Sequence, residues 1–110
     1  GVRIVDWQSW RVDTGTDDLA YMMACHWYPE YRARWERPLV EGYHRALLTY
    51  GVVDYPWPAC WYDYRASVIR CLFFLLGSWH PARPASMWWE RLEKGLLAYE
   101  DLGCAELLAT

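Results

Sequence analysis

The prediction of the fold of this 110-residue chain starts from the stretch Val2-Arg3-Ile4-Val5-Asp6-Trp7-Gln8. Its β-branched, apolar residues predict a short buried strand that ends at the Asp6 carboxylate. A strand needs a partner for its backbone hydrogen bonds, and residues 9–12 follow it across a short turn. We therefore predict a short N-terminal β-hairpin with Asp6 at its tip. Such an aspartate serves either as a metal ligand or as a turn residue, and both interpretations stay open.

The rest of the chain predicts helices, so the expected fold class is mainly α in one domain. Residues 14–16 are expected to form a loop, with Thr16 or Asp17 as the N-cap of a helix that ends near Pro29. Pro29 is suited to begin a further helical turn, because proline is favoured at the first helical position. Later helices are predicted for residues 36–50, for residues 59–76 and from residue 86 onward, with a short turn at 105–109.

The apolar spacing assigns a buried face to two of these helices. Gly51 is expected to end the helix at 36–50 as a C-cap. The predicted buried face of that helix consists of Leu39, Tyr43, Ala46, Leu47 and Tyr50. The predicted buried face of the helix at 59–76 consists of Trp61, Tyr64, Val68, Cys71, Leu72 and Leu75.

Composition argues against several partner classes. Eleven basic and 14 acidic residues leave a net charge of -3, which gives no basic surface for nucleic acid or an anionic membrane. No stretch reaches the roughly 18 apolar residues that cross a bilayer, and no secretory signal precedes the helices. A cytoplasmic setting is therefore expected. The four cysteines are widely spaced, which predicts buried free thiols and no zinc site.

Three short segments together resemble a known enzyme family. Asp6-Trp7-Gln8, Gly15 and then Asp18-Leu19-Ala20 are similar to the metal-binding segment and following helix of the aminoglycoside phosphotransferase and choline-kinase-like superfamily. The similarity extends over nearly the whole chain, in the manner of the ecdysteroid-kinase-like branch. It continues through Pro29-Glu30, Arg32, Glu36, Tyr43-His44, Leu47-Leu48, Gly51 and Asp63-Tyr64-Arg65.

The resemblance implies a protein-kinase-like fold, of which residues 1–110 are the helical C-terminal lobe, a partial phosphotransferase domain. Asp6 matches the family's magnesium-binding aspartate, which holds Mg²⁺ against the phosphates of ATP so that charge is neutralised as the γ-phosphoryl moves. Asp18 matches the aspartate that supports the catalytic loop from behind. Capping and the helix dipole are an equally good explanation for an aspartate near a helix N-terminus.

Two parts of the family's catalytic machinery have no counterpart between Gly1 and Thr110. One is the catalytic loop with its base, and the other is the nucleotide-binding lobe with its lysine. The resemblance places both upstream of Gly1, so the N-terminal lobe of the same polypeptide is an expected partner. We therefore expect a C-terminal fragment that transfers no phosphoryl group by itself.

The family's helical lobe lines the site of a small-molecule alcohol acceptor. Polar residues close to aromatic ones are the expected acceptor contacts, and in this chain they are Trp61, Asp63, Tyr64 and Arg65. For each of them a solvated helix face is the alternative.

A function from another class also fits the composition. Nine tryptophans suit a non-catalytic, all-α binding or interaction module with a tryptophan-rich ligand surface. In that interpretation Asp6 and Asp18 are capping residues. Tryptophans at helical spacing equally supply a core, and we favour the phosphotransferase.

Overall fold

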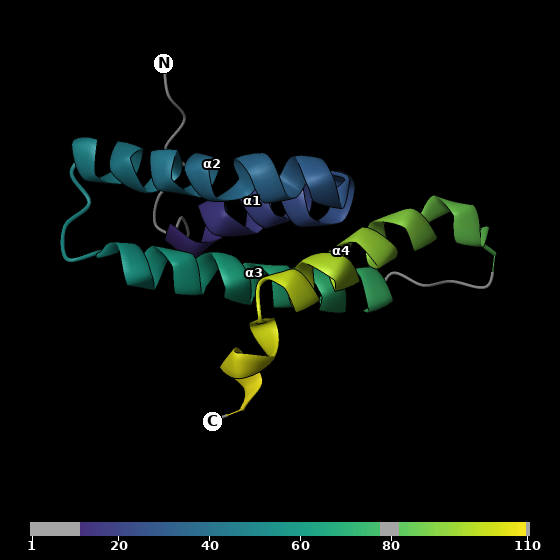
Figure 1. Ribbon diagram of the computed structural model, residues 1–110. Coiled ribbons are helices and arrows are strands. Elements are labelled where there is room, and N and C mark those ends of the chain that lie inside the picture. The colour runs from purple at the N-terminus through teal and green to yellow at the C-terminus, as the bar shows by residue number, and fades with distance from the viewer. Residues whose placement is uncertain (1–11, 78–81, 110) are drawn as a thin grey trace, which may run out of the picture.

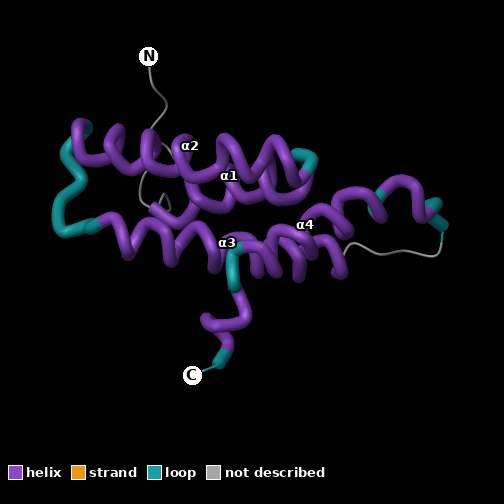
Figure 2. Tube along the Cα trace, viewed as in Figure 1, coloured by secondary structure: helices purple, strands orange, loops and turns teal. Residues whose placement is uncertain are grey.

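The computed structural model describes residues 12–77 and 82–109. Helices connected by short loops make up this part of the chain, and no strand occurs within it (Figure 2). The prediction of a mainly α fold is confirmed for these residues. The elements are α1 (Val12–His26), α2 (Pro29–Thr49), α3 (Trp57–Gly77), η2 (Ala85–Met87), α4 (Trp89–Asp101) and η3 (Cys104–Leu108), where η denotes a 3₁₀ turn.

The first helix lies at the centre of the bundle. It packs mainly against α3 and α4 and also contacts α2. In Figure 1, α2 and α3 run along opposite edges of the molecule, α1 lies behind α2, and α4 crosses the C-terminal half of α3. The last residues leave the bundle through η3 on the side of α3 and α4.

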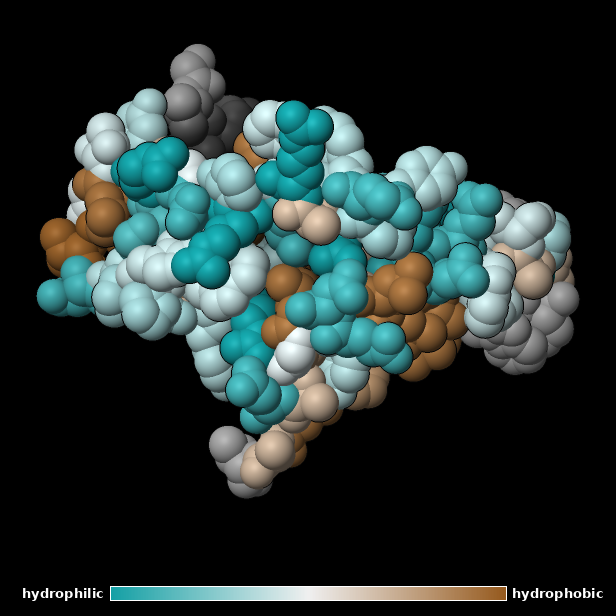
Figure 3. Space-filling view, viewed as in Figure 1, coloured by the Kyte–Doolittle hydropathy of each residue, from teal (hydrophilic) through white to brown (hydrophobic). Residues whose placement is uncertain are grey.

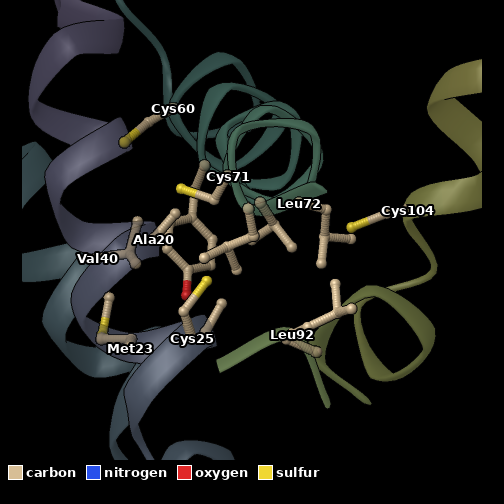
Figure 4. Close-up of a cluster of buried hydrophobic side chains, with 14 residues drawn as sticks. Ala20, Met23, Cys25, Val40, Cys60, Cys71, Leu72, Leu92 and Cys104 are labelled. Atoms are coloured by element: carbon tan, nitrogen blue, oxygen red, sulfur yellow. The ribbon is translucent and has the colours of Figure 1, made fainter. Parts of the chain in front are cut away.

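The core is built where α1 meets the other helices. Ala20, Met23, Ala24 and Cys25 of α1 have no exposed surface. These side chains face Val40 of α2, Leu72 of α3 and Leu92 of α4 across a continuous cluster (Figure 4). All four cysteines are buried and free, as predicted. Burial raises the pKa of the Cys60 and Cys104 thiols, so these two side chains act as packing residues.

The predicted buried face of the third helix is largely confirmed. Tyr64, Val68, Cys71, Leu72 and Leu75 are all buried, whereas Trp61 is half-buried. The helix extends a little further than predicted at each end. None of the helices in the described ranges is long and apolar enough to cross a membrane.

The predicted start of the first helix is wrong. Residues 14–16 were expected to form a loop capped by Thr16 or Asp17, but α1 already begins at Val12. The strand predicted for 9–12 therefore does not include residue 12, and the rest of the hairpin lies outside the described residues. Thr16 is fully buried and its hydroxyl accepts a hydrogen bond from Ser67 of α3, so tertiary contacts hold this turn in the helix.

The glycine in the same turn explains why a loop was expected there. Gly15 lies in α1, and a Cβ atom built on it would collide with the Tyr43 hydroxyl oxygen of α2. The glycine thus permits a close approach of two helices, which is a different reason for glycine than a turn. From the sequence alone the two reasons look the same.

The predicted buried face of α2 is wrong for the most part, because Tyr43 and Leu47 are only half-buried and the other three residues are exposed. Its buried residues are Arg32, Glu36, Val40 and His44, and Leu39, Ala46 and Tyr50 are exposed. The helix is continuous from Pro29, although two segments were expected, and Pro38 lies within it. A prediction from apolar spacing failed here because three of the four buried side chains are polar.

The C-terminus of α2 follows the prediction. Gly51 has a φ of 103°, a left-handed conformation that glycine adopts without steric cost. Its N–H donates to the Leu48 carbonyl, and the Val52 N–H donates to the Leu47 carbonyl over 3.0 Å. This pair of hydrogen bonds is a Schellman motif and satisfies two carbonyls at the helix end.

Candidate functional site

A groove beside the N-terminal half of α1 contains two adjacent carboxylates. It has a volume of about 490 Å³ and is lined by Asp17, Asp18 and Tyr21 of α1 and by Arg70, Cys71 and Phe74 of α3. We call it the acidic groove. Asp17 follows Asp6 by 11 positions in the sequence, and Asp6 itself falls outside the described residues.

Polar contacts fix one wall of the acidic groove. The Arg70 guanidinium donates to Asp17 Oδ1 from Nη2 over 2.8 Å and from Nε over 3.0 Å. Nη2 also donates to the Ser67 hydroxyl, which in turn donates to Thr16 over 2.8 Å. This chain of hydrogen bonds joins α1 to α3, so the position of Asp17 is set by both helices.

Asp18 differs from its neighbour. Its side chain is exposed, and within the described ranges 12–77 and 82–109 no side chain or backbone group forms a hydrogen bond or ion pair with it. It is the seventh residue of α1, too far from the N-terminus for capping and beyond the first turn where the helix dipole acts. The explanation of Asp18 as a cap is therefore wrong. Its backbone is held by the buried residues that follow, such as Ala20.

A second polar cluster lies inside the bundle, where sequence reasoning expected apolar residues. Arg32 Nη1 donates to Glu36 Oε1 over 3.1 Å, and Arg32 Nη2 donates to Asp101 Oδ2 of α4 over 2.5 Å. The Tyr64 hydroxyl of α3 donates to Glu36 Oε2 over 2.5 Å. We call these four residues the buried ion-pair network. It joins α2, α3 and α4.

Burial controls the protonation of this network. The Arg32 side chain is only 2% exposed, whereas the Asp101 side chain is 56% exposed. Burial raises the pKa of Glu36 above its ordinary value of 4.5, and the hydrogen bond from Tyr64 and the charge of Arg32 oppose that rise. Burial and the adjacent Glu36 raise the pKa of Tyr64, so this phenol remains a hydrogen-bond donor.

The four expected acceptor contacts point to different parts of the molecule. The Asp63 carboxylate accepts a hydrogen bond from the Tyr55 hydroxyl over 2.6 Å. Tyr64 is fully buried in the ion-pair network. Arg65 donates to the Gly103 carbonyl and to Glu106, which ties η3 to α3. None of the four lines the acidic groove.

Trp61, the fourth of these residues, belongs to an aromatic stack. Its ring lies between those of Trp57 and Tyr64, with ring centroids 5.5 Å apart on each side. The Arg37 guanidinium lies over both tryptophan rings, a favourable arrangement of cation and ring face. Every expected acceptor contact thus has an intramolecular partner, and its substrate role stays a prediction.

No cluster of three or more metal-ligating side chains occurs among residues 12–77 and 82–109. Among the described residues that line the acidic groove, Asp17 and Asp18 carry the carboxylates, and Asp17 pairs with Arg70. Asp6, to which the resemblance assigns the metal, lies outside the described residues.

Sequence reasoning missed the buried ion-pair network for an identifiable reason. An Arg-Glu pair four residues apart is a common feature of exposed helix faces. Arg37 and Glu41 in the same helix form such an exposed pair. Nothing in the spacing distinguishes the buried pair, Arg32 and Glu36, from the exposed one.

Comparison of the chain with protein-family models, with curated proteins and with solved structures gave no match.

Proposed function

We propose that this chain is the helical C-terminal lobe of an ATP-dependent phosphotransferase of the aminoglycoside phosphotransferase and choline-kinase-like kind. The enzyme would transfer the γ-phosphoryl of ATP to a hydroxyl of a small-molecule alcohol in the cytoplasm. Asp6 would hold Mg²⁺, and the ion would supply positive charge against the negative charge that develops on the phosphates. The catalytic base and the nucleotide-binding lobe come from sequence that precedes Gly1.

The observation that carries this proposal is the order of Asp6-Trp7-Gln8 and Asp18-Leu19-Ala20. The bundle supplies further support. Leu19 and Ala20 pack into the core while Asp18 remains exposed at the acidic groove. A carboxylate held on a rigid helix and free of the described residues is suited to accept hydrogen bonds from another segment. The supporting role that the resemblance assigns to Asp18 requires such a carboxylate.

Two comparisons test the proposal. The encoded sequence before Gly1 should contain a His-x-Asp segment with Asn five residues after that Asp, and a stop codon or an unrelated linker there would contradict it. The longer polypeptide should transfer labelled γ-phosphoryl from ATP to a panel of small alcohols. The 110 residues alone should transfer none, because they lack the base. Phosphorylation by the 110 residues alone would therefore refute the proposal that the catalytic base lies outside them.

The tryptophan-rich binding module is the alternative. Trp57 and Trp61 are half-buried and stacked, as a ligand platform requires. The Arg37 guanidinium already covers these rings, however. A ligand would have to displace it, and for this reason we favour the phosphotransferase.

A further inference from the structure

An apolar groove lies on another flank of α3 from the acidic groove. It is formed between α3 and α4, with η3 at its edge, and its volume is about 240 Å³. Small-molecule sites usually have volumes of roughly 300–1,000 Å³ and place a few polar groups among the apolar ones. This groove is smaller and lined by hydrophobic side chains, which suits an inserted side chain better than a free ligand. Its lining includes Phe73, Leu76, Leu92, Leu96, Tyr99 and Leu108.

The rim of the apolar groove is exposed to an unusual degree. Phe73 is 67% exposed, Leu108 is 59% and Leu76 is 56% exposed. Together with Leu96 these side chains present on the order of 400 Å² of apolar surface, which is the size of the largest apolar patch on a typical monomer, and such a patch is often functional. Figure 3 shows hydrophobic residues gathered over the region where α4 crosses α3.

The same face carries both a projection and a recess. Phe73 forms part of the groove wall and also projects into solvent. A surface with both features is self-complementary, which is the requirement for a two-fold interface between identical chains. We propose that a second copy of this chain docks here, with Phe73 of each copy inserted into the apolar groove of the other.

The available area fits a weak dimer. Two such faces, with their half-buried and polar margins, would bury on the order of 1,000 Å² in total, the lower end for a specific interface. The net charge of -3 per chain gives only modest repulsion between copies. Because the apolar and acidic grooves are lined by different residues of α3, dimerisation leaves the acidic groove accessible and does not depend on the proposed function.

The oligomeric state of matched variants tests this proposal. Sedimentation velocity over a hundredfold range of concentration should show a monomer that converts to a dimer as concentration rises. Leu96→Glu places a charge in the groove and should weaken dimerisation about tenfold or more, since burying an unpaired charge costs at least 1.4 kcal/mol. Leu48→Glu is the control, because Leu48 of α2 is 44% exposed and Leu96 is 46% exposed. It should leave the dimer unchanged.

Phe73→Glu supplies a second disruption, and circular dichroism checks that each variant remains folded. If the Leu96→Glu variant does not fold, the Phe73→Glu variant alone tests the proposed dimer. A monomer at every concentration would overturn the proposal, as would equal effects of Leu96→Glu and Leu48→Glu. Association beyond the dimer would mean a head-to-tail contact and would also overturn it. Binding of a monomer to phosphatidylcholine vesicles would assign the face to lipid instead.

Discussion

The buried ion-pair network and the acidic groove contain the same kinds of side chain in opposite settings. In the network, each oxygen of Glu36 accepts a hydrogen bond, from Arg32 and from Tyr64. In the groove, Asp18 has no partner among the described residues. A charge inside a protein must be satisfied within the fold, whereas an exposed charge costs little when it has no partner. Exposure and lack of a partner thus separate residues available for binding from residues that hold the fold.

The largest effect on the free energy of unfolding is expected when the buried ion-pair network loses Arg32, its only cation. Arg32→Met leaves Glu36 buried without its ion pair, and we expect the free energy of unfolding to fall by about 3–5 kcal/mol. Arg37→Met is the control, since Arg37 also pairs with a glutamate four residues later but is exposed. It should cost about 1 kcal/mol or less. Urea denaturation measures both, and equal losses would contradict the distinction between the two pairs.

A smaller loss of stability is expected from a substitution at the contact between α1 and α2. Gly15→Ala drives a methyl group against the ring of Tyr43 and should destabilise the fold by about 1–3 kcal/mol. Gly42→Ala in α2 is its matched control, because the nearest atom to a Cβ there is 3.8 Å away. That change should stabilise the helix by about 0.5–1 kcal/mol. Thermal unfolding should therefore shift in opposite directions for the two variants, and a shift in the same direction would argue against the close approach.

The pH dependence of stability should report the burial of Glu36. Because its pKa is raised in the folded state, the folded protein holds this proton more tightly than the unfolded chain does. The resulting stabilisation is complete below about pH 4.5, the ordinary value, and is lost as pH rises through the raised pKa. The free energy of unfolding of the wild type, relative to Glu36→Gln, should therefore decrease as the pH rises above about 4.5.

Use of the Glu36→Gln reference removes the titration of other groups, including Asp101 on the far side of Arg32. An increase of this difference with pH would mean that the Arg32 charge outweighs burial and that the pKa is lowered.

The smallest effect on stability is expected at the acidic groove. Asp18→Asn removes a charge that has no partner among residues 12–77 and 82–109, so the free energy of unfolding should change by about 0.5 kcal/mol or less. A loss above 1 kcal/mol in urea denaturation would show that Asp18 holds the bundle together.

The parts of the fold that could be predicted from sequence are those in which burial follows hydrophobicity. The buried face of α3, from Tyr64 to Leu75, and the glycine C-cap at Gly51 are of this kind. The face of α2 could not be predicted, because Arg32 and Glu36 are buried by partners that lie far away in the sequence. The prediction of a loop at Gly15 failed for a similar reason, because Tyr43, the residue that Gly15 approaches, lies far away in the sequence.

The candidate site could be predicted only in part. The sequence singled out Asp18, and the structure places it at the acidic groove together with Asp17 and Arg70. The role of Arg70 in fixing Asp17 depends on the packing of α1 against α3, which no local pattern encodes. The roles assigned to Asp6, Trp61, Asp63, Tyr64 and Arg65 stay predictions.

One measurement tests the central claim most directly, namely that Asp6 binds the Mg²⁺ that phosphoryl transfer requires. In the polypeptide that includes the sequence before Gly1, the rate of ATP-dependent phosphorylation should be compared for Asp6→Asn and Asp54→Asn. Asp54 lies exposed in the α2–α3 loop with a φ of 57°, a conformation that asparagine tolerates equally well. We predict that Asp6→Asn abolishes turnover with unchanged folding and that Asp54→Asn retains it. Full activity of Asp6→Asn would contradict the account.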